Sequence, residues 1–506
     1  MKNQQWLAPL SAAAAAVLLL CSCSAGQSSI DSGKDPGYQP PSYDSNGEVA
    51  LPDIPDGETY LQIVENPEKS AAEAPTVTFS LKVDTASYAN VTRYLESGEL
   101  PPKDAVRTEE LLNYFRYEEE MSFSEGSPFA LYTEVGPSPF HPDKHIAMVR
   151  VKAPEIPQEE LPPCNLTFLI DTSGSMDSYD KLPLLKNAFS LLVETLSEDD
   201  RVSIVTYAGS SAVVLDGVSG ADKTAILDAI HNLTASGSTA GAKGIQTAYE
   251  LARKNFREGG NNRVILATDG DFNVGLSSTS ALAKFIGEKR DSGVYLSILG
   301  FGTGNLRDDV METLSKNGNG NYSYITSAET AKKVLVEEIG TNLFTVADDV
   351  KAQVSFQPEN VKSYRLIGYE NRLLSNEDFE DDRKDAGEIG AGTDVVALFE
   401  IALTDAVQTG DPLFEVRIRY KDPGQTESKL MTQPASLPDS ATPFSTDFGF
   451  ACSVAAFSHL LRGSDYTGDA TFQQVLALAE ENLGRDPGGY RQEYLTLLHH
   501  YKRLAG

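Results

Sequence analysis

Short, almost continuously apolar segments alternate with segments of helical periodicity in the middle of the chain. The apolar segments, which predict strands, are 166–170, 201–208, 263–270, 294–302 and 322–325. Apolar residues recur at helical spacing in 181–196, 221–233, 240–256, 305–318 and 327–344. Apolar strands separated by helices predict an α/β domain with a doubly wound, mostly parallel sheet, because helices cover both faces of such a sheet.

The segments on either side of this domain follow a different pattern. Apolar and polar residues alternate in 129–136, 145–153, 352–358 and 413–421, as in strands with one buried face. We interpret these flanks as a single antiparallel β-sandwich that is interrupted in sequence by the α/β domain. The predicted boundaries are 75–162 for its first half, 163–345 for the inserted domain and 346–440 for its second half.

The C-terminal segment, 444–506, returns to helical spacing. Phe450, Val454, Phe457 and Leu461 fall on one face of a predicted helix, and 472–483 and 489–504 repeat the pattern. These faces predict a small helical bundle that packs on the rest of the protein.

The N-terminus predicts membrane attachment. An apolar run at 6–20 is followed by Cys21 and Cys23, and Cys23 has the small residue before it that a bacterial lipobox requires. We therefore expect a lipoprotein signal peptide at 1–23 with Cys23 lipidated; the alternative is an ordinary secretory signal. Residues 24–60 are rich in Gly, Ser, Pro and Asp, which predicts a disordered tether. The expected location is the cell envelope, and the outer membrane in a cell with two membranes.

Net charge and cysteine content limit the kinds of partner and of covalent link that the sequence predicts. The formal net charge is −31, from 42 Lys and Arg against 73 Asp and Glu, so a nucleic-acid partner is not expected. Beyond the signal peptide only Cys164 and Cys452 remain, and two buried thiols are a better interpretation than a disulfide between distant positions.

Three polar segments follow predicted elements at one edge of the sheet. Asp171, Ser173 and Ser175 come directly after the first strand, Thr239 precedes a helix, and Asp269 ends a third strand. Taken singly, such residues are usually helix caps or turn residues. Together they supply only carboxylate and hydroxyl oxygens, the ligands that Mg²⁺, Mn²⁺ and Ca²⁺ prefer. The sequence therefore predicts a divalent-metal site at this edge.

The same residues resemble the metal-ion-dependent adhesion site of von Willebrand factor A domains. Asp171, Ser173 and Ser175 match that family's Asp-x-Ser-x-Ser motif, Thr239 its threonine and Asp269 its strand-end aspartate. The flanks 83–115 and 361–401 resemble YfbK-type bacterial lipoproteins. The resemblance implies a Mg²⁺ site with one open coordination position. That position would accept an Asp or Glu side chain of a protein or peptide partner.

The sequence favours a binding protein over an enzyme. It contains no GxxxxGK[ST] or GxSxG motif, and no His or Lys is recognisable as a catalytic base or charge clamp. The alternatives are a scaffold subunit of an envelope complex and, less favoured, a metal-dependent phosphohydrolase. The identity of the partner and of the metal stays open.

Overall fold

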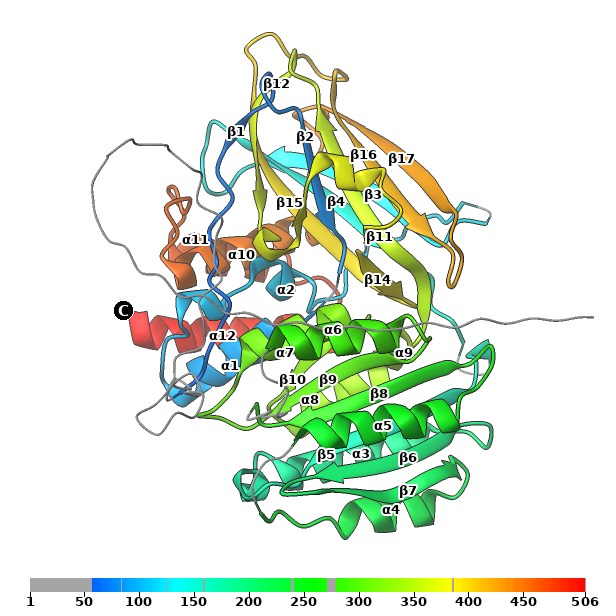
Figure 1. Ribbon diagram of the computed structural model, residues 1–506. Coiled ribbons are helices and arrows are strands. Elements are labelled where there is room, and N and C mark those ends of the chain that lie inside the picture. Colours follow the sequence, from blue (N-terminus) through cyan, green and yellow to red (C-terminus); the bar gives the residue numbers. More distant parts are fainter. Residues whose placement is uncertain are drawn as a thin grey trace, which may run out of the picture. The chain divides into compact units, whose positions relative to one another are not determined.

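A mostly parallel sheet forms the centre of the α/β domain in the computed structural model (Figure 1). The structure describes residues 57–505 except 83, 125, 158–159, 238–240, 271–278 and 385. The strands run in the order β10-β9-β8-β5-β6-β7, and β7 alone in that order is antiparallel to its neighbour. They are β5 (Cys164–Asp171), β6 (Arg201–Tyr207), β7 (Ser211–Ser219), β8 (Asn261–Thr268), β9 (Tyr295–Phe301) and β10 (Tyr322–Ile325).

Helices cover both faces of this sheet, which confirms the predicted doubly wound fold. On β5, Phe168 belongs to the apolar cluster that includes α3 and α4, whereas Leu169 belongs to the cluster that includes α5, α6 and α7. This alternation follows from the two-residue repeat of a strand. The helices of this domain are α3 (Leu182–Thr195), α4 (Lys223–His231), α5 (Gly241–Lys254), α6 (Thr279–Arg290), α7 (Asp308–Asn317), α8 (Ala328–Lys332) and α9 (Ile339–Leu343).

The flanking segments form two antiparallel sheets that enclose one apolar core, as predicted. One sheet has the order β1-β12-β15-β4-β3; the other has the order β13-β2-β11-β16-β17, with β14 paired to β11. The strands before the α/β domain are β1 (Lys69–Ser70), β2 (Thr76–Ser80), β3 (Ala130–Pro137) and β4 (His145–Lys152). Those after it are β11 (Thr345–Phe356), β12 (Val361–Ile367), β13 (Leu373–Leu374), β14 (Gly387–Gly390), β15 (Asp394–Leu403), β16 (Pro412–Lys421) and β17 (Ser428–Ser436). The α/β domain is thus an insertion into a sandwich.

Helices from both ends of the described chain share a further core. The C-terminal helices are α10 (Thr446–Arg462), α11 (Phe472–Glu481) and α12 (Tyr490–Ala505). They pack with α1 (Ala86–Ser97) and α2 (Thr108–Leu112), which lie within the segment that we had assigned to the β-rich flank. Phe115 is at the centre of this contact, with edge-on ring contacts to Phe450 and Tyr494.

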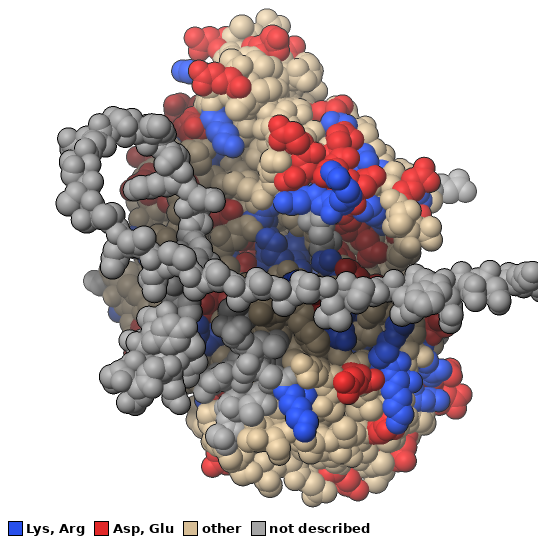
Figure 2. Space-filling model, in the orientation of Figure 1, with Lys and Arg blue, Asp and Glu red and all other residues tan. Residues whose placement is uncertain are grey.

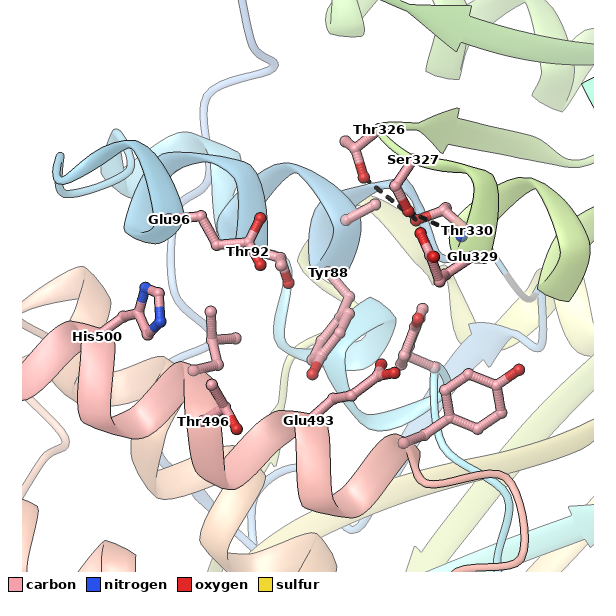
Figure 3. A pocket seen from close by; sticks show the side chains of 14 residues that line it. Tyr88, Thr92, Glu96, Thr326, Ser327, Glu329, Thr330, Glu493, Thr496 and His500 are labelled. Atoms are coloured by element: carbon pink, nitrogen blue, oxygen red, sulfur yellow. Dashed lines mark hydrogen bonds between the residues drawn. The ribbon is translucent and has the colours of Figure 1, made fainter. Parts of the chain in front are cut away.

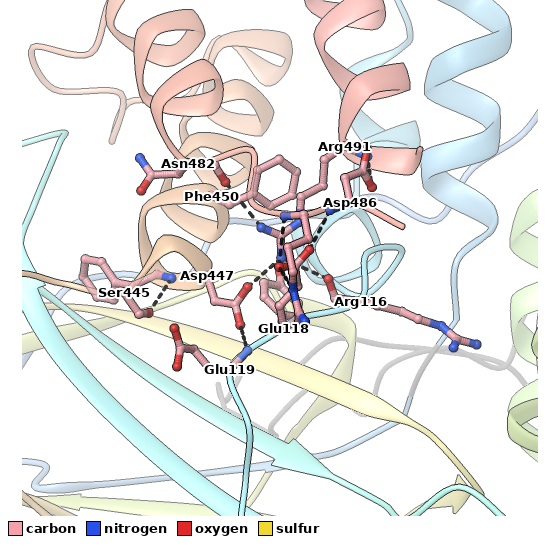
Figure 4. A network of polar contacts seen from close by, with 12 residues as sticks. Arg116, Glu118, Glu119, Ser445, Asp447, Phe450, Asn482, Asp486 and Arg491 are labelled. Atoms are coloured by element: carbon pink, nitrogen blue, oxygen red, sulfur yellow. Dashed lines mark hydrogen bonds and ion pairs between the residues drawn. The ribbon is translucent and has the colours of Figure 1, made fainter. Parts of the chain in front are cut away.

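A buried ion network joins the sandwich to the C-terminal helices (Figure 4). Arg150 on β4 is fully buried and forms ion pairs with Asp394 (2.7 Å) and Asp447 (3.3 Å). Asp447 also pairs with Arg491 of α12 at 2.6 Å and accepts a hydrogen bond from the backbone amide of Glu119. Each buried charge therefore has a partner, as the low dielectric of the interior requires.

Acidic and basic side chains are interspersed on the face of the protein shown in Figure 2. Over the sandwich, Arg417 and Arg419 on β16 pair with Glu380, and Arg419 also pairs with Asp382. The basic side chains of β16 are thus paired with acidic side chains of the sandwich.

The predicted tether, 24–60, is wrong at its C-terminal end. The Glu58 carboxylate accepts hydrogen bonds from Arg93 (2.7 Å), Tyr60 (2.6 Å) and Tyr94 (2.7 Å), and from the Gly304 amide (3.0 Å). These bonds hold residues 58–60 against the α/β domain. The rest of the tether up to residue 56, and Cys23 with the signal peptide, lie outside the described residues.

Cys164 and Cys452 are both buried and free, which confirms the prediction of two buried thiols. Across the part of the chain that the structure describes, no helix is both long enough and apolar enough to cross a bilayer.

Candidate metal centre

The first predicted segment lies at the carboxyl end of β5. The strand is buried throughout and ends at Asp171, whose carboxylate is fully buried and accepts a 2.8 Å hydrogen bond from the Ser173 amide. The chain then turns, and the hydroxyls of Ser173 and Ser175 come within 2.9 Å of each other. The strand thus delivers one carboxylate and two hydroxyls to the same place.

The second segment is tied to the first through backbone hydrogen bonds. The Gly174 amide donates to the Gly237 carbonyl (3.0 Å), and the Ser236 amide donates to the Thr172 carbonyl (2.8 Å). These bonds bring Ser236 and Gly237, which precede Thr239 in the sequence, to the Asp171 turn. Thr239 itself lies outside the described residues.

The third segment is the carboxyl end of β8, the neighbour of β5 in the sheet. Asp269 is fully buried, and its carboxylate is hydrogen-bonded by Ser175. Gly270 follows with φ of +104°, and a Cβ here would lie 2.6 Å from the Arg307 amide nitrogen. Only glycine fits this turn, so the close approach of the 305–307 loop to Asp269 depends on it.

Lys181 is a further member of the site, and our sequence analysis missed it. Its ammonium lies 2.9 Å from the Asp269 carboxylate and also donates to the side chain of Asn305 (3.2 Å). The side chain runs across Gly302, where a Cβ would approach its Cε to 2.3 Å. Two features of the sequence could have pointed to this lysine. It lies ten positions after Asp171, and Gly302, which leaves room for its side chain, follows the next strand, β9.

Burial and charge set the pKa values of the two carboxylates apart. Burial raises the pKa of Asp171 to about 6, and the nearby charge of Asp269 adds to this rise. Burial also opposes ionisation of Asp269, but the ammonium of Lys181 outweighs it and lowers the pKa of Asp269. Asp171 is therefore a desolvated carboxyl with no cation of its own among the described residues.

Comparison with known proteins shows how this domain is related to others. Residues 165–338 match the von Willebrand factor type A domain, and residues 54–148 match the family described as von Willebrand factor. Residues 341–504 match the family described as "Uncharacterized protein YfbK, C-terminal". The chain is 43% identical to "Uncharacterized protein YfbK" of Escherichia coli (strain K12) over 462 residues. This match covers 87% of this chain and 80% of that protein. The chain belongs to the YfbK family.

More distant relatives share smaller parts of this YfbK-family chain. "Uncharacterized protein sll0103" of Synechocystis sp. is 26% identical over 282 residues, covering 54% of this chain and 66% of that protein. Among solved structures, a von Willebrand factor type A protein from Catenulispora acidiphila is similar, with a TM-score of 0.43 and 18% identity. The similarity covers 74% of this chain and 91% of that chain.

The described residues of this YfbK-family site fit a hard divalent cation. Asp171, Ser173, Ser175 and Asp269 present only oxygen atoms, from two buried carboxylates and two hydroxyls. Such oxygens suit Mg²⁺, Mn²⁺ or Ca²⁺ and do not suit softer metals. A bound cation would also supply the charge that the desolvated Asp171 carboxylate lacks.

Proposed function

We propose that this protein is a cell-envelope lipoprotein whose von Willebrand factor A domain binds a partner through a divalent metal. Membership of this domain family indicates a protein-interaction or adhesion role. The observation that carries the proposal is the convergence of two buried carboxylates and two serine hydroxyls at one rim of the sheet.

The chain's own residues have distinct roles in this proposal. Asp171, Ser173, Ser175, Thr239 and Asp269 would hold the ion. The bound metal would supply a Lewis acid that accepts an Asp or Glu carboxylate from the partner. Lys181 holds Asp269 in place through a buried ion pair and offsets one of the two negative charges. Because the site lies at the carboxyl ends of strands, the partner would reach the bound metal without disturbing the core.

A binding role is favoured over phosphate hydrolysis. Lys181 is the cation nearest to the candidate ligands among the described residues, and it is already bonded to Asp269 and Asn305. A lysine engaged in this way does not provide a free clamp for a transferred phosphoryl group. The scaffold alternative uses the same metal site with a permanent partner.

Lipidation of Cys23 would hold this domain at the membrane surface, through the segment that precedes Glu58. The acidic composition of the chain, with a net charge of −31, supports a protein partner over nucleic acid.

The test is to compare Asp171→Ala with Asp199→Ala, which removes an exposed carboxylate from the turn before β6. Each full-length protein is purified in detergent and melted with and without Mg²⁺. At 100 times the dissociation constant, a ligand that binds only the native state adds about 2.7 kcal/mol of stability. Wild type and Asp199→Ala should show this gain, and Asp171→Ala should show almost none.

Affinity capture from solubilised envelopes, in Mg²⁺ or in EDTA, tests the partner. Capture by wild type should be lost in EDTA and lost with Asp171→Ala. Capture that survives both changes would show that the site residues act only as caps and turns.

A further inference from the structure

A cavity of about 350 Å³ lies between α1, α12 and the segment that follows β10 (Figure 3). It shares no lining residue with the candidate metal centre. Helix α1 contributes Tyr88 and Glu96, α12 contributes Glu493 and His500, and α8 contributes Glu329. In Figure 3 these side chains point from three elements toward a common space.

The cavity has an excess of negative charge. Glu96 and Glu493 form no hydrogen bond or ion pair with any residue that the structure describes. Burial raises the pKa of Glu493, and the neighbouring charges of Asp486, Glu329 and Glu96 contribute to the rise. Lys333 pairs with Glu338, and its ammonium lies 4.7 Å from the Tyr114 ring and 4.2 Å from the Tyr490 ring at the cavity wall. The described lining residues themselves include three glutamates and no Lys or Arg.

A buried phenol also faces this space without a partner. Tyr88 is 4% exposed, and within the described part of the chain its hydroxyl makes no hydrogen bond. In Figure 3 the ring lies between Glu96 and Glu493. The Thr92 hydroxyl and Nδ1 of His500 are likewise buried without a partner. Unpaired buried polar atoms that line a cavity are free to bond a ligand or water that enters it.

The geometry does not suit an inorganic ion. Among the described residues that line this cavity, no three acidic or histidine side chains converge closely enough to hold a metal. A cavity of about 350 Å³ is also of the size that encloses a small organic molecule. The carboxylates are separated from one another, and tyrosine rings line the wall. These features suit a cation whose two charges are joined by an apolar chain, because its ammonium groups can contact the carboxylates while its methylene groups contact the rings.

We propose that this cavity binds a small organic dication of the alkyldiamine class. One ammonium group lies between Glu493 and the Tyr88 hydroxyl, and the other reaches Glu96. Tyr88 and Tyr114, whose rings stack at 3.8 Å, form the wall along which the carbon chain lies. The cavity follows the end of β10, so the ligand contacts both the α/β domain and the helices of the flanks.

The probe is 1,4-diaminobutane, titrated calorimetrically into the full-length protein in EDTA so that the metal centre does not contribute. Wild type should bind one molecule per chain, whereas the uncharged butane-1,4-diol should not bind. Glu493→Gln, which keeps the shape of the side chain, should weaken binding about tenfold to a hundredfold, since it removes a charged hydrogen bond. Tyr88→Phe should weaken binding about threefold to tenfold.

Glu481→Gln is the matched control, because it removes an exposed carboxylate from α11 and should bind as wild type does. Circular dichroism and melting temperature verify that each variant is folded. The proposal is overturned if wild type shows no saturable binding of the diamine. It is also overturned if folded Glu493→Gln and Tyr88→Phe both bind as tightly as wild type, or if the diol binds equally well.

Discussion

Replacing Lys181 by methionine should tighten metal binding while it destabilises the metal-free protein. Methionine keeps much of the apolar length that crosses Gly302 but removes the ammonium 2.9 Å from Asp269. In the absence of metal, Asp269 then becomes a fully buried carboxylate with no cation beside it. A bound divalent cation restores the missing charge.

The magnitude follows from a thermodynamic cycle. Breaking a buried ion pair by removing one partner costs about 3–5 kcal/mol, and this pair is buried on both sides, with side chains 10% and 0% exposed. With metal bound, the cost should fall to that of a lost hydrogen bond, about 1 kcal/mol. The difference of about 2–4 kcal/mol must appear as tighter metal binding, which is roughly 30-fold to several-hundred-fold in the dissociation constant.

The assay is calorimetric titration of Mg²⁺ into full-length wild type and Lys181→Met, paired with melting curves in EDTA and in saturating Mg²⁺. Lys284→Met is the control, because it makes the same chemical change on an exposed position of α6. The control should match wild type in both measurements. Lys181→Met should melt well below wild type in EDTA and approach it in Mg²⁺.

A weaker Mg²⁺ affinity for Lys181→Met would refute this reasoning. It would mean that the ammonium orients Asp269 for the metal and does not compete with the metal for charge. Equal affinities would place Asp269 outside the metal's electrostatic reach.

Three further predictions concern the rest of the chain. Burial, with the charge of Glu370, raises the pKa of Glu109 to about 7, above its unfolded value of 4.5. The folded protein therefore binds this proton more tightly than the unfolded chain does, and the free energy of unfolding falls as pH rises from 4.5 to 7. Glu109→Gln should therefore match wild type in denaturant unfolding at pH 4.5 and exceed it by a few kcal/mol at pH 8, and an equal difference at both pH values would contradict this cause. Asp447→Asn should cost about 3–5 kcal/mol of unfolding free energy because it leaves two buried arginines short of a charge, whereas the exposed control Asp439→Asn should cost under about 1 kcal/mol. Cys23→Ser should move the protein from the membrane fraction to the soluble fraction and Cys21→Ser should not, and retention of the Cys23 variant after a carbonate wash would disprove lipidation there.

The sheet of the α/β domain was predictable because its strands carry a local signal. A segment such as 166–170 is apolar on both faces, and that pattern is typical of a strand covered by helices on both sides. The convergence of the candidate ligands followed from topology, since neighbouring parallel strands bring Asp171 and Asp269 to one edge regardless of sequence separation.

The role of Lys181 and the packing of α1 and α2 into the helical core were not predictable, because both depend on contacts that no local pattern records. The Lys181 ammonium reaches Asp269 through a long, flexible side chain, and its path is fixed by the absence of a side chain at Gly302. Helix α1 packs on α12, which follows it by roughly 400 positions in sequence. Its own spacing of Tyr88, Val91 and Leu95 indicates a buried face but does not say what covers that face.

The contact made by Glu58 lies beside the candidate metal centre. Its carboxylate holds the Gly304 amide, and the Thr59 amide donates to the Leu306 carbonyl at 2.9 Å. Asn305 lies between these two contacts in sequence, and its side-chain oxygen accepts a hydrogen bond from the Lys181 ammonium. The chain therefore enters the folded body beside the same loop that supports Asp269. If Cys23 carries the lipid, about 35 residues separate it from Glu58, so a partner that binds this edge of the sheet is expected to be a protein of the same membrane or one bound close to its surface.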